Sequence, residues 1–120
     1  MATQPAKTLE TFPNPHPNNS YTIRFQTSEF TTVCPLTGQP DFARITVEYE
    51  PGEKCLESKS VKLYLWSFRD EGHFHEDVTN IILNDMVRAC APRSMVVTGH
   101  FNARGGIDFF ITARHNAPTI

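Results

Sequence analysis

Residues 57–70 read ESKSVKLYLWSFRD, and here the spacing of apolar residues changes from the alternation of strands to the period of a helix. The apolar side chains that share one helical face are Val61, Leu65 and Phe68. Ser58 or Ser60 is a suitable N-cap, because a hydroxyl oxygen accepts a hydrogen bond from a free backbone N–H. The stretch therefore predicts a helix in the middle of a chain whose first half reads as strands.

Segments on either side complete the predicted order. Residues rich in β-formers predict strands at 21–33, as one bulged strand or two, and at 43–49. Apolar residues at helical spacing predict a second helix over 75–92. Two more strands, at 94–101 and 107–113, are joined by the glycine-containing connection NARGG. The order is β-β-α-α-β-β.

This order predicts an α+β fold with an antiparallel sheet and both helices on one face. Such a sheet has two edge strands without partners. Pairing of those edges between subunits would close a ring and bury more apolar surface than a chain of 120 residues buries alone.

Length and proline distribution predict one domain preceded by an arm. Four of the nine prolines lie in the first 17 residues, which is typical of an extended, mobile segment. We therefore expect a flexible proline-rich arm over 1–19 and a single catalytic domain over 20–120.

Charge and cysteine content exclude several classes of partner. The net charge of −2 gives no general attraction to nucleic acid or to an anionic membrane. No apolar run approaches the roughly 20 residues that span a bilayer, and the N-terminus lacks the apolar segment of a secretion signal. The three cysteines are odd in number and form no CxxC pair. We expect a cytoplasmic protein with reduced thiols.

The segment TVCPLTGQPD, residues 32–41, places a cysteine and a carboxylate at the two ends of a stiff loop. Two prolines fix φ within it and a glycine permits a tight reversal, so Asp41 can return toward the sulfur of Cys34. Covalent chemistry at Cys34 with Asp41 as proton donor or acceptor is one reading. The alternative is a small buried cysteine with no chemistry, which is our expectation for Cys55 and Cys90.

The segment EGHFHED, residues 71–77, contains His73 and His75 before two acids. A zinc site would need Cys34 and a further ligand, and no ligand motif supplies one, so we predict no metal. Acids at a helix start are often explained by the helix dipole alone. Alternatively, Glu76 can accept two parallel N–H bonds from a guanine-like edge while His75 exchanges protons near neutral pH.

A lysine cluster lies in KCLESKSVK, residues 54–62. Lys59 and Lys62 stand near a helix start, where backbone N–H groups also favour phosphate, and Arg104 adds a cation before two glycines. The cluster also fits a simple solvated helix face. No P-loop and no GxGxxG follows a strand, so any nucleotide site is not Rossmann-like.

Four segments together resemble the NADPH-dependent 7-cyano-7-deazaguanine reductases, the QueF nitrile reductase family. All eight positions of ESKSVKLY (57–64) fit the family signature, CPLTGQPDFA (34–43) resembles its catalytic loop, and FHED (74–77) and RGGI (104–107) are similar to further family segments. The resemblance implies the tunnelling fold, whose subunits join into a β-barrel ring, and a short single-module subfamily that commonly forms a decamer of two pentamers.

The resemblance also implies the reaction. A Cys34 thioimide forms with the nitrile, Asp41 supplies a proton, and NADPH reduces the adduct to 7-aminomethyl-7-deazaguanine, a precursor of the tRNA nucleoside queuosine. The residues implied for substrate are Leu56, Glu57, Ser58, His75 and Glu76, with His75 also catalytic. Those chosen for NADPH are Lys59, Lys62 and Arg104. Direct contact with nucleic acid or a membrane is not expected.

Two other functions remain open. A different tunnelling-fold enzyme of the cyclohydrolase type, acting on a pterin or purine, would use Cys34 as a metal ligand. A non-enzymatic nucleobase-binding module would retain Glu76 and have no use for Cys34 and Asp41.

Overall fold

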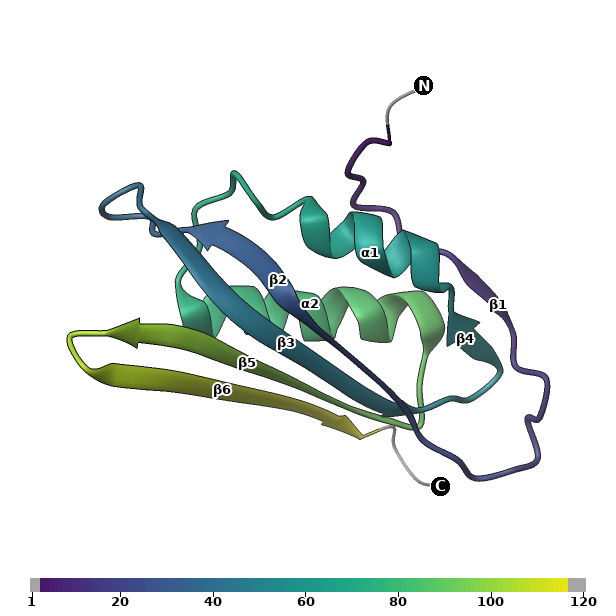
Figure 1. Cartoon of the computed structure of the whole chain (residues 1–120). Coiled ribbons are helices and arrows are strands. Elements are labelled where there is room, and N and C mark those ends of the chain that lie inside the picture. The colour runs from purple at the N-terminus through teal and green to yellow at the C-terminus, as the bar shows by residue number, and fades with distance from the viewer. Residues whose placement is uncertain (1–2, 117–120) are drawn as a thin grey trace.

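The computed structural model describes residues 3–116, which form two helices and six strands (Figure 1). In chain order these are β1 (Thr11–Pro13), β2 (Ile23–Val33), β3 (Pro40–Glu50), β4 (Lys54–Leu56), α1 (Ser58–Trp66), α2 (His75–Cys90), β5 (Ser94–Arg104) and β6 (Ile107–Asn116). The predicted order corresponds to β2-β3-α1-α2-β5-β6.

The main sheet is antiparallel with strand order β2-β3-β5-β6, and both helices cover the same face (Figure 1). Side chains alternate between buried and exposed along β3, so one face of the strand lies against the helices. The largest fully buried side chains come from β3, from β5, from the two helices and from the segment directly after α1: Tyr49, Tyr64, Phe68, Phe101, Ile45, Ile82, Met86 and Met95. The predicted α+β fold with two helices on one face is confirmed.

Two local predictions are decided by the structure. Residues 23–33 form one strand with a register shift between Thr27 and Phe30, so the bulged alternative holds. Neither Ser58 nor Ser60 caps α1. The N-cap is Glu57, whose extended backbone lets its carboxylate accept hydrogen bonds from the backbone N–H groups of residues 59 and 60, both at 2.8 Å.

A second, two-stranded sheet was not predicted. β1 pairs with β4, and the segment before it runs along α1. Outside the β1–β4 pairing, three backbone hydrogen bonds join residues 6–14 to the rest of the domain, from Ala6 to Leu63, from Glu57 to Glu10 and from Asn14 to Glu53. The arm predicted over 1–19 is therefore not detached from the domain in its described part. Its three-residue strand is too short to show alternation in the sequence.

Both outer strands of the main sheet, β2 and β6, lack a second neighbour among residues 3–116. Strand β6 also exposes three large apolar side chains, Ile107, Phe109 and Phe110. An unpaired edge with exposed apolar residues favours pairing with another strand. In the described part of the chain, neither helix has the length and apolar character needed to cross a bilayer.

Candidate active site

The loop between β2 and β3 holds Cys34 in a closed turn. The backbone N–H of Cys34 donates to the carbonyl of Gln39 at 2.8 Å, and that of Gly38 donates to the carbonyl of Cys34 at 2.9 Å. Gly38 has a φ of 75°, a conformation that L side chains rarely adopt. The sequence prediction of a stiff loop at this place agrees with these contacts.

The thiol group of Cys34 is half-buried and faces hydrogen-bond donors. The hydroxyl of Thr37 is the largest influence on its pKa, and the backbone N–H groups of Thr37 and Leu36 act in the same direction. Together they lower the pKa of Cys34, although slight burial and the charge of Asp41 oppose them. The turn therefore favours the thiolate, which is the nucleophilic form. Sequence reasoning missed Thr37, because the loop alone does not show where the hydroxyl points.

Asp41 is the buried carboxylate of the site, with 6% of its surface exposed. Its Oδ1 forms an ion pair with Nη2 of Arg104 at 2.6 Å, and its Oδ2 lies 3.5 Å from Nε2 of His75. Arg104 also donates to the carbonyl of Pro40 at 3.0 Å. The structure thus brings Arg104 to the carboxylate that sequence reasoning chose as the proton donor.

His75 is fixed by aromatic contacts at the start of α2. Its ring stacks on Phe101 with centroids 4.0 Å apart and planes 11° apart, and it meets Phe109 edge-on at 5.5 Å. These contacts hold Nε2 toward Asp41. Phe101 and Phe109 lie in two of the predicted strands. Their contacts with His75 depend on the packing of α2 over β5 and β6, which the sequence pattern does not show.

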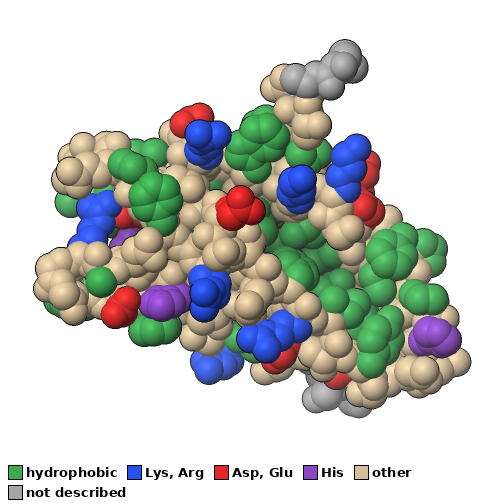
Figure 2. All heavy atoms as spheres, viewed as in Figure 1, with side chains coloured by type: hydrophobic (Ala, Val, Ile, Leu, Met, Phe, Trp, Pro, Cys, Tyr) green, Lys and Arg blue, Asp and Glu red, His purple; other side chains and the backbone are tan. Residues whose placement is uncertain are grey.

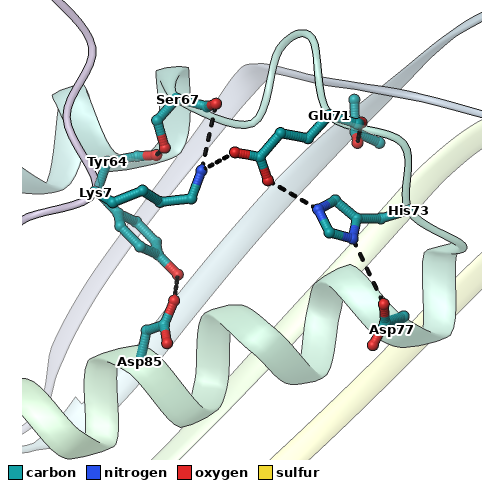
Figure 3. A network of polar contacts seen from close by, with 8 residues as sticks. Lys7, Tyr64, Ser67, Glu71, His73, Asp77 and Asp85 are labelled. Atoms are coloured by element: carbon teal, nitrogen blue, oxygen red, sulfur yellow. Dashed lines mark hydrogen bonds and ion pairs between the residues drawn. The ribbon is translucent and has the colours of Figure 1, made fainter.

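Glu76 is exposed in the first turn of α2, and its carboxylate has no hydrogen-bond or ion-pair partner among the described side chains. The N-cap is Phe74, which makes no side-chain capping bond. Glu76 is therefore free to meet a ligand. Within residues 3–116 no group of three or more potential metal-ligating residues occurs, and His73 instead contacts Glu71 and Asp77 (Figure 3).

The residues predicted at the start of α1 form a second group. Leu56 is buried, and both carboxylate oxygens of Glu57 are used in capping the helix, where the backbone N–H groups of Lys59 and Ser60 lower its pKa. Lys59 and Lys62 are exposed one turn apart. Glu57 thus has a structural task in addition to the substrate contact predicted for it.

A groove of about 1140 Å³ runs between α1 and β2. Figure 2 shows hydrophobic side chains gathered in this hollow with cationic groups at its rim. Among its lining residues are Phe25, Leu56, Ser58, Lys62, Trp66 and Phe42. It passes beside the Cys34 loop at Val33 and Pro40. Its size suits a nucleotide-like ligand.

The predicted site residues therefore lie in two places within one chain. Cys34, Asp41, His75 and Arg104 meet at the end of the sheet where the β2–β3 loop lies, with Glu76 next to His75. The second group, with Leu56, Glu57, Ser58, Lys59 and Lys62, stands at the opposite end of α1 (Figure 1). Arg104 is thus separated from the two lysines with which it was grouped as a cofactor cation, and its assignment to NADPH stays a prediction.

Known proteins resemble this chain over most of its length. A protein from Anaeromyxobacter sp. (strain Fw109-5) named NADPH-dependent 7-cyano-7-deazaguanine reductase is 60% identical over 115 residues, which cover 96% of this chain and 94% of the relative. One of the same name from Alkalilimnicola ehrlichii is 56% identical over 118 residues, covering 98% and 92%.

A solved structure shares the fold. The apo crystal structure of an archaeosine synthase, QueF-Like, superposes with a TM-score of 0.75 at 23% identity, covering 82% of this chain and 96% of that one. The tunnelling fold expected from the sequence resemblance is confirmed by this likeness. The family model described as QueF-like protein matches residues 40–119. With that match and relatives at 56–60% identity along nearly the whole chain, this protein belongs to the QueF family.

Proposed function

We propose that this protein uses NADPH to reduce the nitrile of 7-cyano-7-deazaguanine to the primary amine of 7-aminomethyl-7-deazaguanine. The observation that carries the proposal is the Cys34 turn, which lowers the pKa of the thiol beside a buried carboxylate. The names of the relatives support the same substrate and cofactor. The amine is a precursor of queuosine, so the reaction belongs to the biosynthesis of this tRNA nucleoside.

The first step is attack of the Cys34 thiolate on the nitrile carbon. A nitrile is a weak electrophile, and a thiolate is a strong, soft nucleophile. One π bond of the nitrile breaks as the sulfur–carbon bond forms, and the nitrogen must take a proton as negative charge develops on it. The product of this step is a thioimide on Cys34.

Asp41 and His75 handle that proton. Oδ1 of Asp41 is paired with Arg104, which leaves Oδ2 as the oxygen that can take a proton and give it to the nitrogen. His75 lies 3.5 Å away and can pass a proton to the second carboxylate oxygen. The stacked ring of His75 holds the donor nitrogen in place during the transfer.

The residues present suit the phosphates of NADPH. Lys59 and Lys62 are exposed, stand on one side of α1 near its N-terminus, and make no ion pair within the described chain. Bound NADPH would supply two hydride equivalents for each nitrile. The first would go to the thioimide carbon, and the second would go to the carbon of the free imine, after the carbon–sulfur bond breaks and Cys34 leaves as the thiolate. The covalent bond to Cys34 would hold the thioimide carbon in place for the first hydride.

We further propose that the site is completed by a second copy of the chain. The two groups of site residues lie at opposite ends of α1, and both edge strands are unpaired in the described chain. Pairing of β2 with β6 of a neighbour would close a ring and cover the groove. A decamer of two stacked pentamers is the assembly that we propose.

Glu76 is expected to determine base recognition. The ligand presents a ring N–H beside an exocyclic amine, and a carboxylate accepts from both, whereas Glu76→Gln places a donor opposite a donor. We expect roughly ten- to hundredfold weaker binding, from a mismatch that costs about 1–3 kcal/mol. Calorimetry of the nitrile substrate measures it. Asp77→Asn, one residue away, is the matched control, and the melting temperature of both variants should stay near that of the wild type. Unchanged affinity in Glu76→Gln would refute the anchoring role.

The function is tested by mixing the protein with 7-cyano-7-deazaguanine and NADPH in the presence of a metal chelator. The loss of NADPH absorbance reports its oxidation. We expect two NADPH oxidised per nitrile and none with 7-deazaguanine, which lacks the nitrile. Turnover that requires added metal would favour a cyclohydrolase-type enzyme. Tight binding without NADPH oxidation would favour a nucleobase-binding module.

A further inference from the structure

A chain of polar contacts joins the N-terminal segment to the loop between α1 and α2 (Figure 3). Nζ of Lys7 forms an ion pair with the carboxylate of Glu71 and donates to the carbonyl of Ser67 at 3.3 Å. The other oxygen of Glu71 lies 2.9 Å from Nε2 of His73, and Nδ1 of His73 lies 3.5 Å from Asp77. Lys7 of the arm is thus connected through two side chains, Glu71 and His73, to Asp77 in the first turn of α2.

Lys7 is seated at a defined place, because it also makes an aromatic contact. Its ammonium nitrogen lies 4.0 Å from the ring centroid of Phe68, a favourable cation–π geometry. Phe68 is fully buried and packs against the rings of Phe30, Tyr64 and His73. The arm therefore holds the loop through the loop's own core side chain as well as through charge.

On its opposite side, this loop holds the end of β2, directly before Cys34. The carbonyl of Glu71 accepts from the backbone N–H of Val33 at 2.9 Å and from the hydroxyl of Thr32 at 2.7 Å. The N–H of His73 donates to the carbonyl of Val33 at 3.0 Å. Val33 is the residue directly before Cys34, so the loop fixes the backbone from which the thiol projects.

We propose that Lys7, Glu71 and His73 form a clamp that positions Cys34, acting through the backbone of residues 71–73. These are positioning residues, since the described contacts take them to the loop and not to the thiol. In this proposal the N-terminal segment helps to position the nucleophile. The importance of the clamp for catalysis rests on the proposed function of Cys34.

The environment of Glu71 favours its charged form at neutral pH. Partial burial is the largest influence on the pKa of Glu71 and raises it, but hydrogen bonds and charge from His73 and Lys7 outweigh it, and the net pKa is lowered. A carboxyl with a lowered pKa in the folded state stabilises the structure above its ordinary pKa of about 4.3, and this contribution is lost as the pH falls through the lowered value. The Glu71 carboxylate is therefore charged at neutral pH and can pair with Lys7 and His73.

The test is the rate at which iodoacetamide alkylates Cys34, read by peptide mass mapping across pH, with buried Cys55 and Cys90 as internal references. Lys7→Met and Glu71→Gln should loosen the turn that stabilises the thiolate. We expect alkylation near neutral pH to slow about three- to tenfold, since small displacements of a reacting group have effects of this order or larger. The pH midpoint of alkylation should rise in both variants.

Matched controls separate positioning from general stability. Lys54→Met and Glu53→Gln change the same residue types at exposed places away from the clamp and should leave the rate unchanged. Lys7→Arg should retain the wild-type rate, and the double variant of Lys7→Met and Glu71→Gln should cost no more than the larger single change. Rates equal to the controls, faster alkylation, or losses that only follow the unfolded fraction in a thermal melt would overturn the proposal.

This measurement uses neither the nitrile nor NADPH, so it is independent of the proposed function. A second measurement tests the link between the clamp and the proposed function. The rate of covalent adduct formation with 7-cyano-7-deazaguanine should fall in the clamp variants while substrate affinity stays unchanged. A wild-type protein that forms no adduct would refute the proposed function and leave the alkylation result to decide the clamp.

Discussion

Cys34→Ala is expected to abolish both NADPH oxidation and every covalent adduct with the nitrile, while the fold is retained. The side chain is half-buried at the end of β2, and the turn around it is closed by backbone hydrogen bonds that alanine keeps. The sulfur, however, is the strongest nucleophile in this turn, because the Thr37 hydroxyl is not ionised near neutral pH and is a far weaker nucleophile than a thiolate. Intact-mass measurement of the wild type with nitrile and without NADPH should show one added ligand per chain.

The pH dependence of this adduct reports the environment of the thiol. Because the Thr37 hydroxyl and the neighbouring N–H groups lower the pKa of Cys34, the adduct should form rapidly at pH values below the ordinary thiol pKa of about 8.5. Leu36→Ala is a suitable control, since this side chain is 80% exposed in the same turn and its backbone N–H remains. An adduct on Cys55 or Cys90, or one that survives in Cys34→Ala, would contradict the assignment.

The fold was largely predictable because its elements follow simple periods. Strand β3 alternates strictly and the apolar residues of α1 follow a helical period, so the type and order of these elements could be read directly. In the helix predicted over 75–92, Asp85 occupies a position on the apolar face, where a carboxylate is unexpected. The structure explains it through a hydrogen bond of 2.6 Å from the buried hydroxyl of Tyr64. Pairing between distant polar groups of this kind leaves no local pattern in the sequence.

The site was predictable where its residues are close in the chain. Cys34 and Asp41 lie at the two ends of one short loop, so proximity followed from turn geometry. The partners of Asp41 come from elsewhere, His75 from the start of α2 and Arg104 from the end of β5. Only packing of the helix over the sheet brings these side chains together.

The same limit explains the N-terminal segment. The proline-rich composition predicted an arm, but composition does not show which residues a single lysine in that arm contacts. Lys7 and Glu71 are 64 positions apart in the sequence. Lys7 also contacts Phe68, a core residue in the loop that follows α1. Long-range contacts between exposed side chains leave no periodic pattern in the sequence, so only the structure reveals the clamp.

Asp41→Asn should leave substrate binding intact but reduce turnover by about 10²- to 10⁴-fold, the usual contribution of a positioned proton donor. Asparagine has nearly the same shape and can still accept from Arg104 at the position of Oδ1. An amide cannot take a proton from His75 and pass it to the nitrile nitrogen, so the attack by sulfur would lack its proton. Stopped-flow measurement of adduct formation, beside steady-state NADPH oxidation, locates the loss.

Arg104→Gln is the informative comparison. It removes the same ion pair, in which 43% of the arginine side chain is exposed, but leaves the acid in place. If Asp41 acts by proton transfer, this variant should form the adduct far faster than Asp41→Asn. Equal losses in the two variants would mean that the ion pair orders the β5–β6 hairpin and that Asp41 does not move the proton. Near-normal turnover of Asp41→Asn would make His75 the donor, since its Nε2 is the titratable atom held beside the carboxylate.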